Sequence, residues 1–212
     1  LTVEERRGDG QGSTGAIPGI LMAIGNEGRS LNRDPFSLHT YVSRDGGWTW
    51  SKTLEEPCVF AFGDLGNVIV AAPFTKDKEN LTSKKFYYSL DQATTWQTIE
   101  LEDAVFPTLL TTAIDGTTSN FLFVGIQPKQ DSMKQILFSL DFSKAFSRTC
   151  GPNDFEKWYG RSKGNNEGSC VFGHKDIYNR RKADADCLKV NPLYAPCKKH
   201  ILSQLIRLPS FL

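Results

Sequence analysis

The chain has 212 residues, with 25 Lys and Arg against 24 Asp and Glu, so its formal net charge is only +1. This balance argues against a polybasic nucleic-acid binder and against an acidic tail protein. A hydrophobic content of 39% is too high for a disordered chain, and no apolar run approaches the ~18 residues of a membrane span. The chain begins with Leu1 and the charged run Glu4–Arg7, which is no signal sequence. We therefore expect a processed chain or a piece of a longer protein.

Residues 1–16 are Gly-rich and charged without periodicity, and we expect a loop or a disordered start there. From residue 17 on, short runs rich in Val, Ile, Phe, Tyr and Thr alternate with turn residues, as β-strands do. The predicted strands are Gly19–Gly25, Leu38–Ser43, Thr49–Leu54, Val59–Phe62, Asn67–Ala72, Lys85–Ser89, Thr95–Leu101, Val105–Ile114, Phe121–Ile126 and Gln135–Leu140. This spacing is typical of an all-β barrel, sandwich or propeller.

An internal repeat is the most specific signal in the chain. Two segments, Ser43–Trp50 and Ser89–Trp96, both read S-x-D-x-[GA]-x-T-W, and a degenerate copy starts at Ser139. The first two copies lie 46 residues apart, and a repeat of about 40–50 residues with four strands per unit is the sequence mark of propeller blades. We call these two segments Asp box 1 and Asp box 2.

The Asp boxes are predicted to be structural hairpin turns rather than catalytic sites. The Asp carboxylate accepts backbone N–H bonds within the turn, the Gly supplies a backbone conformation that a side chain would oppose, and the Trp anchors the turn. Ala93 replaces the Gly in Asp box 2, so that turn is predicted to be either strained or differently shaped. The residues assigned to this role are Ser43, Asp45, Gly47, Trp50, Ser89, Asp91 and Trp96.

Four of the five cysteines crowd the last third of the chain, while Cys58 stands alone. Four cysteines in about fifty loop-like residues suggest a disulfide-stapled module in an oxidising compartment, although three pairings are open. Reduced thiols remain an alternative, as does a zinc site from Cys170, His174, Cys187 and Cys197, whose spacing lacks C-x-x-C knuckles. Asn80 begins an N-glycosylation sequon in a polar stretch. These features favour the secretory pathway.

Taken together, the repeats and the cysteine region resemble the sortilin family of sorting receptors, most closely the fungal vacuolar protein sorting receptors. The resemblance covers roughly residues 16–197. It is carried by the two Asp boxes and by the segments Phe60–Ala71, Tyr88–Asp91, Ser139–Ser143, Asp154–Tyr159, Cys170–Lys175 and Arg180–Cys187, with Cys150 and Tyr178 in the expected order. Asp boxes alone would be unspecific, whereas the ordered cysteine region after the last blade is specific.

The resemblance implies an all-β fold: part of a ten-bladed β-propeller followed by a small disulfide-stapled, cysteine-rich module. Residues 17–149 would form the last blades, 150–197 the module and 198–212 an atypical tail that departs from the family. The implied bridges are Cys150–Cys187 and Cys170–Cys197, which leave Cys58 without a partner. The short basic run Arg180–Lys182 is interpreted as a solvated face.

The resemblance also implies a function. In that family, the receptor binds soluble hydrolases or propeptides in the lumen and carries them from Golgi to endosome or vacuole, without catalysis, cofactor, metal or nucleic acid. This chain would be a fragment of such a receptor, bound to a membrane only through parts that it lacks. One alternative is a truncated, non-functional relic of the receptor. The other is a sialidase-like Asp-box glycosidase, for which Tyr41, Tyr87 or Tyr88 would have to supply the nucleophile.

Overall fold

The computed structural model describes residues 2–4 (backbone only), 17–32, 34, 37–74, 82–113, 116–129, 132–159 and 177–188. The regular structure within these ranges is almost entirely antiparallel β-strand. The strands are β1 (Thr2–Glu4), β2 (Leu21–Asn26), β3 (His39–Ser43), β4 (Ser51–Leu54), β5 (Cys58–Gly63), β6 (Val68–Pro73), β7 (Ser83–Ser89), β8 (Gln97–Thr112), β9 (Asn120–Lys129), β10 (Ser132–Asp141), β11 (Phe155–Tyr159) and β12 (Ile177–Arg181), and two single 3-10 turns are η2 (Asp64–Gly66) and η3 (Pro152–Asp154). The same ranges contain no helix that is long and apolar enough to cross a bilayer.

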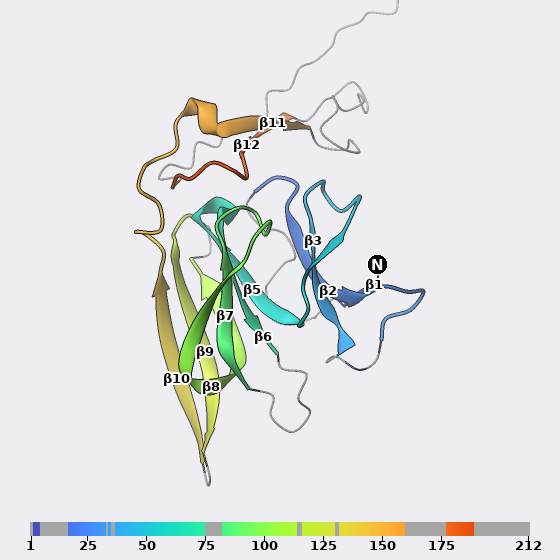
Figure 1. Cartoon of the computed structure of the whole chain (residues 1–212), viewed down its shortest axis with the longest axis vertical. Helices are drawn as coiled ribbons and strands as arrows, with labels where there is room; N and C mark the ends of the chain where they lie inside the picture. Colours follow the sequence, from blue (N-terminus) through green and yellow to red (C-terminus); the bar gives the residue numbers. More distant parts are fainter. Residues whose placement is uncertain are drawn as a thin grey trace, which may run out of the picture.

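The strands form two meandering sheets and a hairpin (Figure 1). The first sheet has the order β1-β2-β3-β4, and the second has the order β10-β9-β8-β7-β6-β5. β8 belongs to two units, because its first half pairs with β7 and its second half, after Val105, pairs with β9. The described strands therefore form one four-stranded unit, β1–β4, a second, β5–β8, and a third that contains the end of β8 with β9 and β10.

The three units stack face to face and share two apolar cores. The first core joins β2–β4 to one face of β5–β7, with Met22, Val42 and Ile69 buried in it. The second core joins the opposite face of β5–β7 to β8–β10. In it, the rings of Phe86 and Phe123 meet edge to face, with their centroids 4.4 Å apart. Sheets that pack on a neighbour through each face, in chain order, are consistent with consecutive blades of a partial propeller.

Two expectations about single elements need correction. Residues 1–16 were expected to form a loop, but Thr2–Glu4 pairs with β2 as strand β1. The separate strands Thr95–Leu101 and Val105–Ile114 are one strand, β8. A register shift between Pro107 and Leu109 accommodates the proline, which cannot donate to the ladder.

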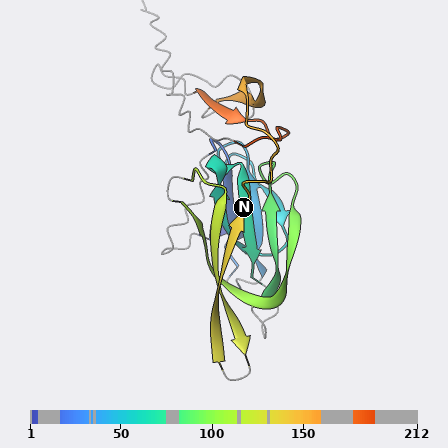
Figure 2. The ribbon, with the colours of Figure 1, turned by 90° about the vertical axis from the view of Figure 1, so that its left-hand side faces the viewer.

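The last described segments form a small module at one end of the sheets (Figures 1 and 2). It contains the β11–β12 hairpin, paired from Phe155 opposite Arg181 to Tyr159 opposite Ile177. A disulfide joins Cys150 to Cys187, with 4.9 Å between their Cα atoms, and is accompanied by a parallel bridge between Thr149 and Leu188. The architecture is thus all-β, with a disulfide-bridged module after the sheets.

Candidate functional site: the junction of the Asp boxes and the bridged module

Asp box 1 is a turn closed by the Asp45 carboxylate. Its Oδ1 accepts hydrogen bonds from the Ser43 hydroxyl (2.8 Å) and the Thr49 N–H (2.9 Å), and its Oδ2 accepts from the Thr49 hydroxyl (2.6 Å). The Gly47 N–H donates to Ser43 Oγ at 2.8 Å, and the Trp50 indole donates to the Gly47 carbonyl at 3.0 Å. Burial alone would raise the pKa of Asp45, but the bonds from Thr49 and Ser43 outweigh it and lower the pKa.

Asp box 2 repeats this arrangement and extends it to the neighbouring unit. The Asp91 carboxylate accepts from Ser89 Oγ (2.8 Å), from the Thr95 N–H (2.9 Å) and from the Thr95 hydroxyl (2.6 Å). Its pKa is likewise lowered, because these bonds outweigh the effect of burial. The Trp96 indole donates to Thr53 Oγ1 at 2.7 Å, so this ring anchors Asp box 2 to β4.

The backbone shows what Ala93 does in Asp box 2. Gly46 and Gly47 have φ of 75° and 93°, and Gln92 and Ala93 have φ of 61° and 60°. The Ala93 N–H still donates to Ser89 Oγ at 2.9 Å, as the corresponding glycine does in Asp box 1. The turn therefore keeps its shape, and two side-chain-bearing residues take the strained left-handed conformation.

Carboxylates in this state are poorly suited to acid–base catalysis, because their oxygens already accept several hydrogen bonds. Burial raises the pKa of Tyr41 and raises that of Tyr87 to about 12, the reverse of activation as a nucleophile. The Tyr88 hydroxyl donates to the Gln97 side-chain oxygen. The residues named for a glycosidase thus serve structural contacts in the described part of the chain.

The basic run on β12 is not a solvated face, so that interpretation is wrong for Arg180 and Arg181. Arg181 is 1% exposed, and its guanidinium donates to four backbone carbonyls, those of Ala185 (2.6 Å), Cys187 (3.0 Å), Asn67 (3.4 Å) and Leu90. The first two carbonyls belong to the module and the other two to the β5–β8 unit. Arg181 therefore fastens the module to the sheet.

Burial lowers the pKa of Arg181, and the nearby carboxylates, that of Asp64 foremost, oppose the shift. The guanidinium also lies 5.3 Å from the centre of the Phe146 ring, a favourable cation–π position. The carbonyl oxygens and the aromatic ring around this buried cation replace much of the interaction with water that the guanidinium loses on burial.

A second set of contacts connects the two Asp boxes with each other and with the module. Arg44, in Asp box 1, donates from Nε to the Gln92 carbonyl (3.2 Å) and from Nη2 to the Ala93 carbonyl (2.5 Å). Arg180 donates to the Arg44 carbonyl at 2.9 Å and pairs with Glu156 at 2.7 Å. In the other direction, the Gln92 amide donates to the Arg181 carbonyl.

Trp158 of β11 completes the junction by packing on glycines of the first unit. A Cβ at Gly19 would lie 2.6 Å from the Trp158 ring, and one at Gly46 would lie 3.6 Å from it, so the ring rests on bare backbone. Sequence reasoning missed the roles of Trp158, Arg44 and Arg181. Arg44 lies inside the repeat, and Trp158 and Arg181 lie in segments that carry the family resemblance, but none of these positions indicated which contacts the side chains make.

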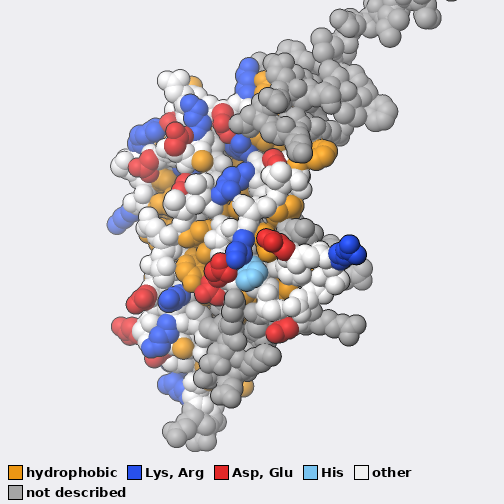
Figure 3. Space-filling model, turned by 45° about the vertical axis from the view of Figure 1, so that its right-hand side comes forward, with side chains coloured by type: hydrophobic (Ala, Val, Ile, Leu, Met, Phe, Trp, Pro, Cys, Tyr) orange, Lys and Arg blue, Asp and Glu red, His pale blue; other side chains and the backbone are white. Residues whose placement is uncertain are grey.

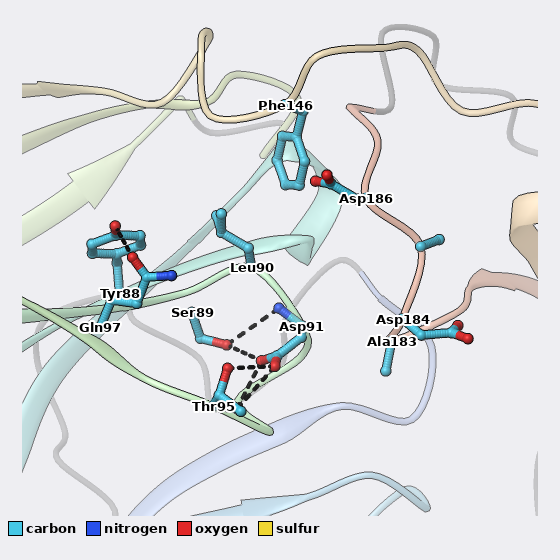
Figure 4. Close-up of a pocket in the computed structure, with 11 residues that line it drawn as sticks. Tyr88, Ser89, Leu90, Asp91, Thr95, Gln97, Phe146, Ala183, Asp184 and Asp186 are labelled. Atoms are coloured by element: carbon cyan, nitrogen blue, oxygen red, sulfur yellow. Dashed lines mark hydrogen bonds between the residues drawn. The ribbon is translucent and has the colours of Figure 1, made fainter.

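An acidic cleft of about 250 Å³ opens between Asp box 2 and the 183–186 loop of the module (Figure 4). Its carboxylates come from Asp91, Asp184 and Asp186, and its aromatic walls from Tyr88 and Phe146. No Lys or Arg of the described chain lines it. The oxygens of Asp91 already accept hydrogen bonds from Ser89 and Thr95, and Asp91 and Asp186 interact electrostatically with the buried Arg181.

Of the remaining predicted sites, the Cys150–Cys187 bridge is present, and Cys58 is a free, fully buried thiol. Cys150, Asp154 and Cys187 lie close enough together to suggest a metal site, but the bridge occupies both sulfurs. It also removes Cys187 from the zinc alternative. The predictions that lie outside the described residues are Cys170, His174, Cys197, the sequon at Asn80 and the 198–212 tail.

Comparison with known families agrees with this architecture. The profile of the family described as sortilin, neurotensin receptor 3, matches residues 2–110. The chain belongs to the sortilin family. The profile for the C-terminal part of sortilin matches residues 112–201, which include the cysteine-bridged module.

Individual relatives of this sortilin-family chain come from fungi. It is 44% identical over 198 residues to vacuolar protein sorting/targeting protein 10 of Candida albicans. The aligned region covers 92% of this chain and 12% of that protein. It is 41% identical over 181 residues to vacuolar protein sorting/targeting protein PEP1 of Saccharomyces cerevisiae. Here the aligned region covers 84% of this chain and 11% of that protein. The chain therefore spans about one eighth of the length of the curated relatives that it matches.

Proposed function

We propose that this chain is part of the luminal domain of a sorting receptor that binds soluble hydrolase or propeptide cargo for transport from Golgi to endosome or vacuole. The observation that carries the proposal is the 44% identity to a vacuolar protein sorting/targeting protein over 92% of the chain. The proposal places the chain in the lumen of the secretory pathway and the longer receptor in Golgi and endosome membranes. It involves no catalytic step and no cofactor.

The proposal also assigns roles to individual segments and residues of the chain. Residues 17–149 act as the last propeller blades, 150–197 as the cysteine-rich module, and 198–212 as a tail with no assigned role. The Asp boxes are structural, Cys170 pairs with Cys197, and Asn80 carries a glycan. The hydrogen bonds that saturate Asp45 and Asp91 support the structural role.

A chimera in yeast tests the proposal, with residues 17–197 replacing the matching segment of the Saccharomyces cerevisiae receptor. We expect cells with the chimera to retain a soluble vacuolar hydrolase, and cells with the segment deleted to secrete it. Immunoblotting for equal receptor levels and glycosidase treatment for luminal exposure are the controls. Secretion of the hydrolase despite normal chimera levels would refute the proposal.

A binding measurement isolates the cargo step. The purified chain is passed over an immobilised propeptide of a vacuolar hydrolase, and the mature hydrolase without its propeptide is the matched surface. We expect binding to the first surface only. Equal binding to both surfaces would show that the chain does not recognise the propeptide.

A further inference from the structure

The two central residues of Asp box 2 carry side chains where Asp box 1 has glycines. Gln92 and Ala93 have φ of 61° and 60°, and Gly46 and Gly47 hold the same positions in Asp box 1. A side chain disfavours the left-handed conformation by roughly fivefold to thirtyfold per residue. Such conformations persist only where the surrounding structure holds them. Asp box 2 therefore needs contacts that Asp box 1 does not.

The hydrogen bonds within the turn do not supply this difference. In both boxes the Asp carboxylate accepts from a Ser hydroxyl, from a Thr N–H and from the hydroxyl of the same Thr, and Figure 4 shows this set around Asp91. The bond from the Thr hydroxyl is 2.6 Å long in each box. Because the local bonds are nearly equal, contacts from other parts of the fold must hold the left-handed residues of Asp box 2.

These contacts reach the turn from two directions. From the first sheet unit, Arg44 and Thr53 donate to the Ala93 carbonyl at 2.5 and 3.2 Å, and Arg44 also donates to the Gln92 carbonyl at 3.2 Å. From the module, the Arg181 carbonyl accepts a bond from the Gln92 amide at 2.5 Å. Gln92 and Ala93 are each 2% exposed, so water cannot replace these partners. A glycine at position 92 would relieve strain, but it would lose the amide that reaches the module.

The contacts close into a ring that passes through all three parts of the junction. Arg180 donates to the Arg44 carbonyl at 2.9 Å, the Arg44 side chain holds Gln92, and Gln92 reaches Arg181, the residue next to Arg180. Lys and Arg side chains are spread over the surface seen in Figure 3, whereas Arg180 and Arg181 are only 7% and 1% exposed. In a buried network of this kind, the loss of one contact weakens the others.

We propose that the Gln92–Ala93 turn is a strained latch that couples docking of the module to the packing of the first sheet unit on the second. In the closed state both residues are left-handed and the ring is complete. When the ring breaks at the module, the turn loses the contacts that hold it, relaxes, and withdraws its two carbonyls from Arg44. A change at the module is thereby transmitted to the joint between the two sheet units, because both bias the same two-state element.

Hydrogen exchange of the full chain, followed by NMR at the turn amides, tests the proposal. The amides of Ala93, Thr94 and Thr95 report on the latch, because they donate to side chains inside the turn. Their exchange rates measure how often the turn opens.

Arg180→Ala is the variant that breaks the ring at the module. In the described part of the chain, the Arg180 guanidinium donates to Arg44 and Glu156 but to no residue of Asp box 2. We expect the turn amides to exchange at least about tenfold faster in this variant, because the strain then opens the turn. Lys182→Ala, at an exposed position two residues away, is the matched control and should leave exchange unchanged.

Ala93→Gly separates release of strain from simple loss of a contact. It removes the Cβ that disfavours the turn and keeps the carbonyl that accepts from Arg44 and Thr53. Added to Arg180→Ala, it should return the exchange of the turn amides to within about threefold of the wild-type rate, because glycine takes the left-handed conformation freely. A contact that served packing alone would not be rescued in this way.

Near-UV circular dichroism verifies that each variant is folded, and Glu156→Gln, which weakens the 2.7 Å ion pair of Arg180, replaces Arg180→Ala if the latter is not. Unchanged exchange of the turn amides would overturn the proposal, and so would faster exchange that Ala93→Gly fails to reverse. Equal acceleration at Phe123, in the second core, would also overturn it, because global unfolding would then explain the effect. None of these measurements involves cargo, so the outcome is separate from that of the proposed function.

Discussion

The buried guanidinium of Arg181 gives the sharpest prediction about stability. Arg181→Met keeps an unbranched apolar stem but removes the guanidinium group with every donor. Four carbonyl oxygens, those of Asn67, Leu90, Ala185 and Cys187, lose their shared partner. Two of these contacts hold the module together and two hold it to the sheet, so the variant loosens both.

The expected magnitude follows from the burial of the group. A hydrogen bond from a charged donor contributes about 1.5–3 kcal/mol, but four bonds from one group are not additive. The desolvation that lowers the pKa of Arg181 is relieved in the variant and offsets part of the loss. Breaking a buried charged network typically costs about 3–5 kcal/mol, and we expect the free energy of unfolding to fall by this amount.

Guanidinium denaturation followed by tryptophan fluorescence measures this loss, because Trp158 sits at the same junction and packs on Gly19 and Gly46. Lys182→Met is the matched control, since Lys182 is the next residue and is exposed. It should change the free energy of unfolding by less than about 0.5 kcal/mol. A loss below about 1 kcal/mol for Arg181→Met, or equal losses in the two variants, would refute the assigned role.

Three further predictions concern the turns and the bridge. Gly47→Ala should lower the free energy of unfolding by about 1–2 kcal/mol, because a side chain disfavours the left-handed φ of 93°; no loss in urea denaturation would contradict this. Cys187→Ser opens a bridge across 37 residues and should cost about 4 kcal/mol by the same measurement, whereas an unchanged midpoint would count against the bridge. Asp91 has a lowered pKa in the folded state, so its contribution is present above the ordinary carboxyl pKa of about 3.9 and is lost as the pH falls through the lower folded value. The stability advantage of the wild-type chain over Asp91→Asn should therefore be constant near neutral pH and shrink in acid, and a pH-independent advantage would exclude this linkage.

Local sequence patterns determined much of the architecture. The alternation of apolar and turn residues predicted β2–β10, because a strand with a buried face needs that pattern wherever it lies in the chain, but it did not predict β1, β11 or β12. The Asp boxes were predictable for the same reason, since Ser89, Asp91 and Thr95 make their hydrogen bonds within seven residues of one another. The sequence did not predict that β8 is one continuous strand, because only its pairing with both β7 and β9 makes it so.

Contacts between segments far apart in the chain were decided by the tertiary structure alone. A run of basic residues on a strand is ordinarily solvated, and nothing near Arg181 in the sequence says that the carbonyls of Asn67 and Leu90 lie within its reach. Likewise, Gln92 and Ala93 stand where Asp box 1 has glycines, and only the packing of β4 and the module on Asp box 2 shows what holds them in the left-handed conformation. The sequence by itself thus determined β2–β10, because their apolar pattern is local, and the Asp-box turns, because their hydrogen bonds are local. The tertiary structure decided which charges are buried and which distant contacts hold the turn of Asp box 2, because both depend on what the fold brings alongside.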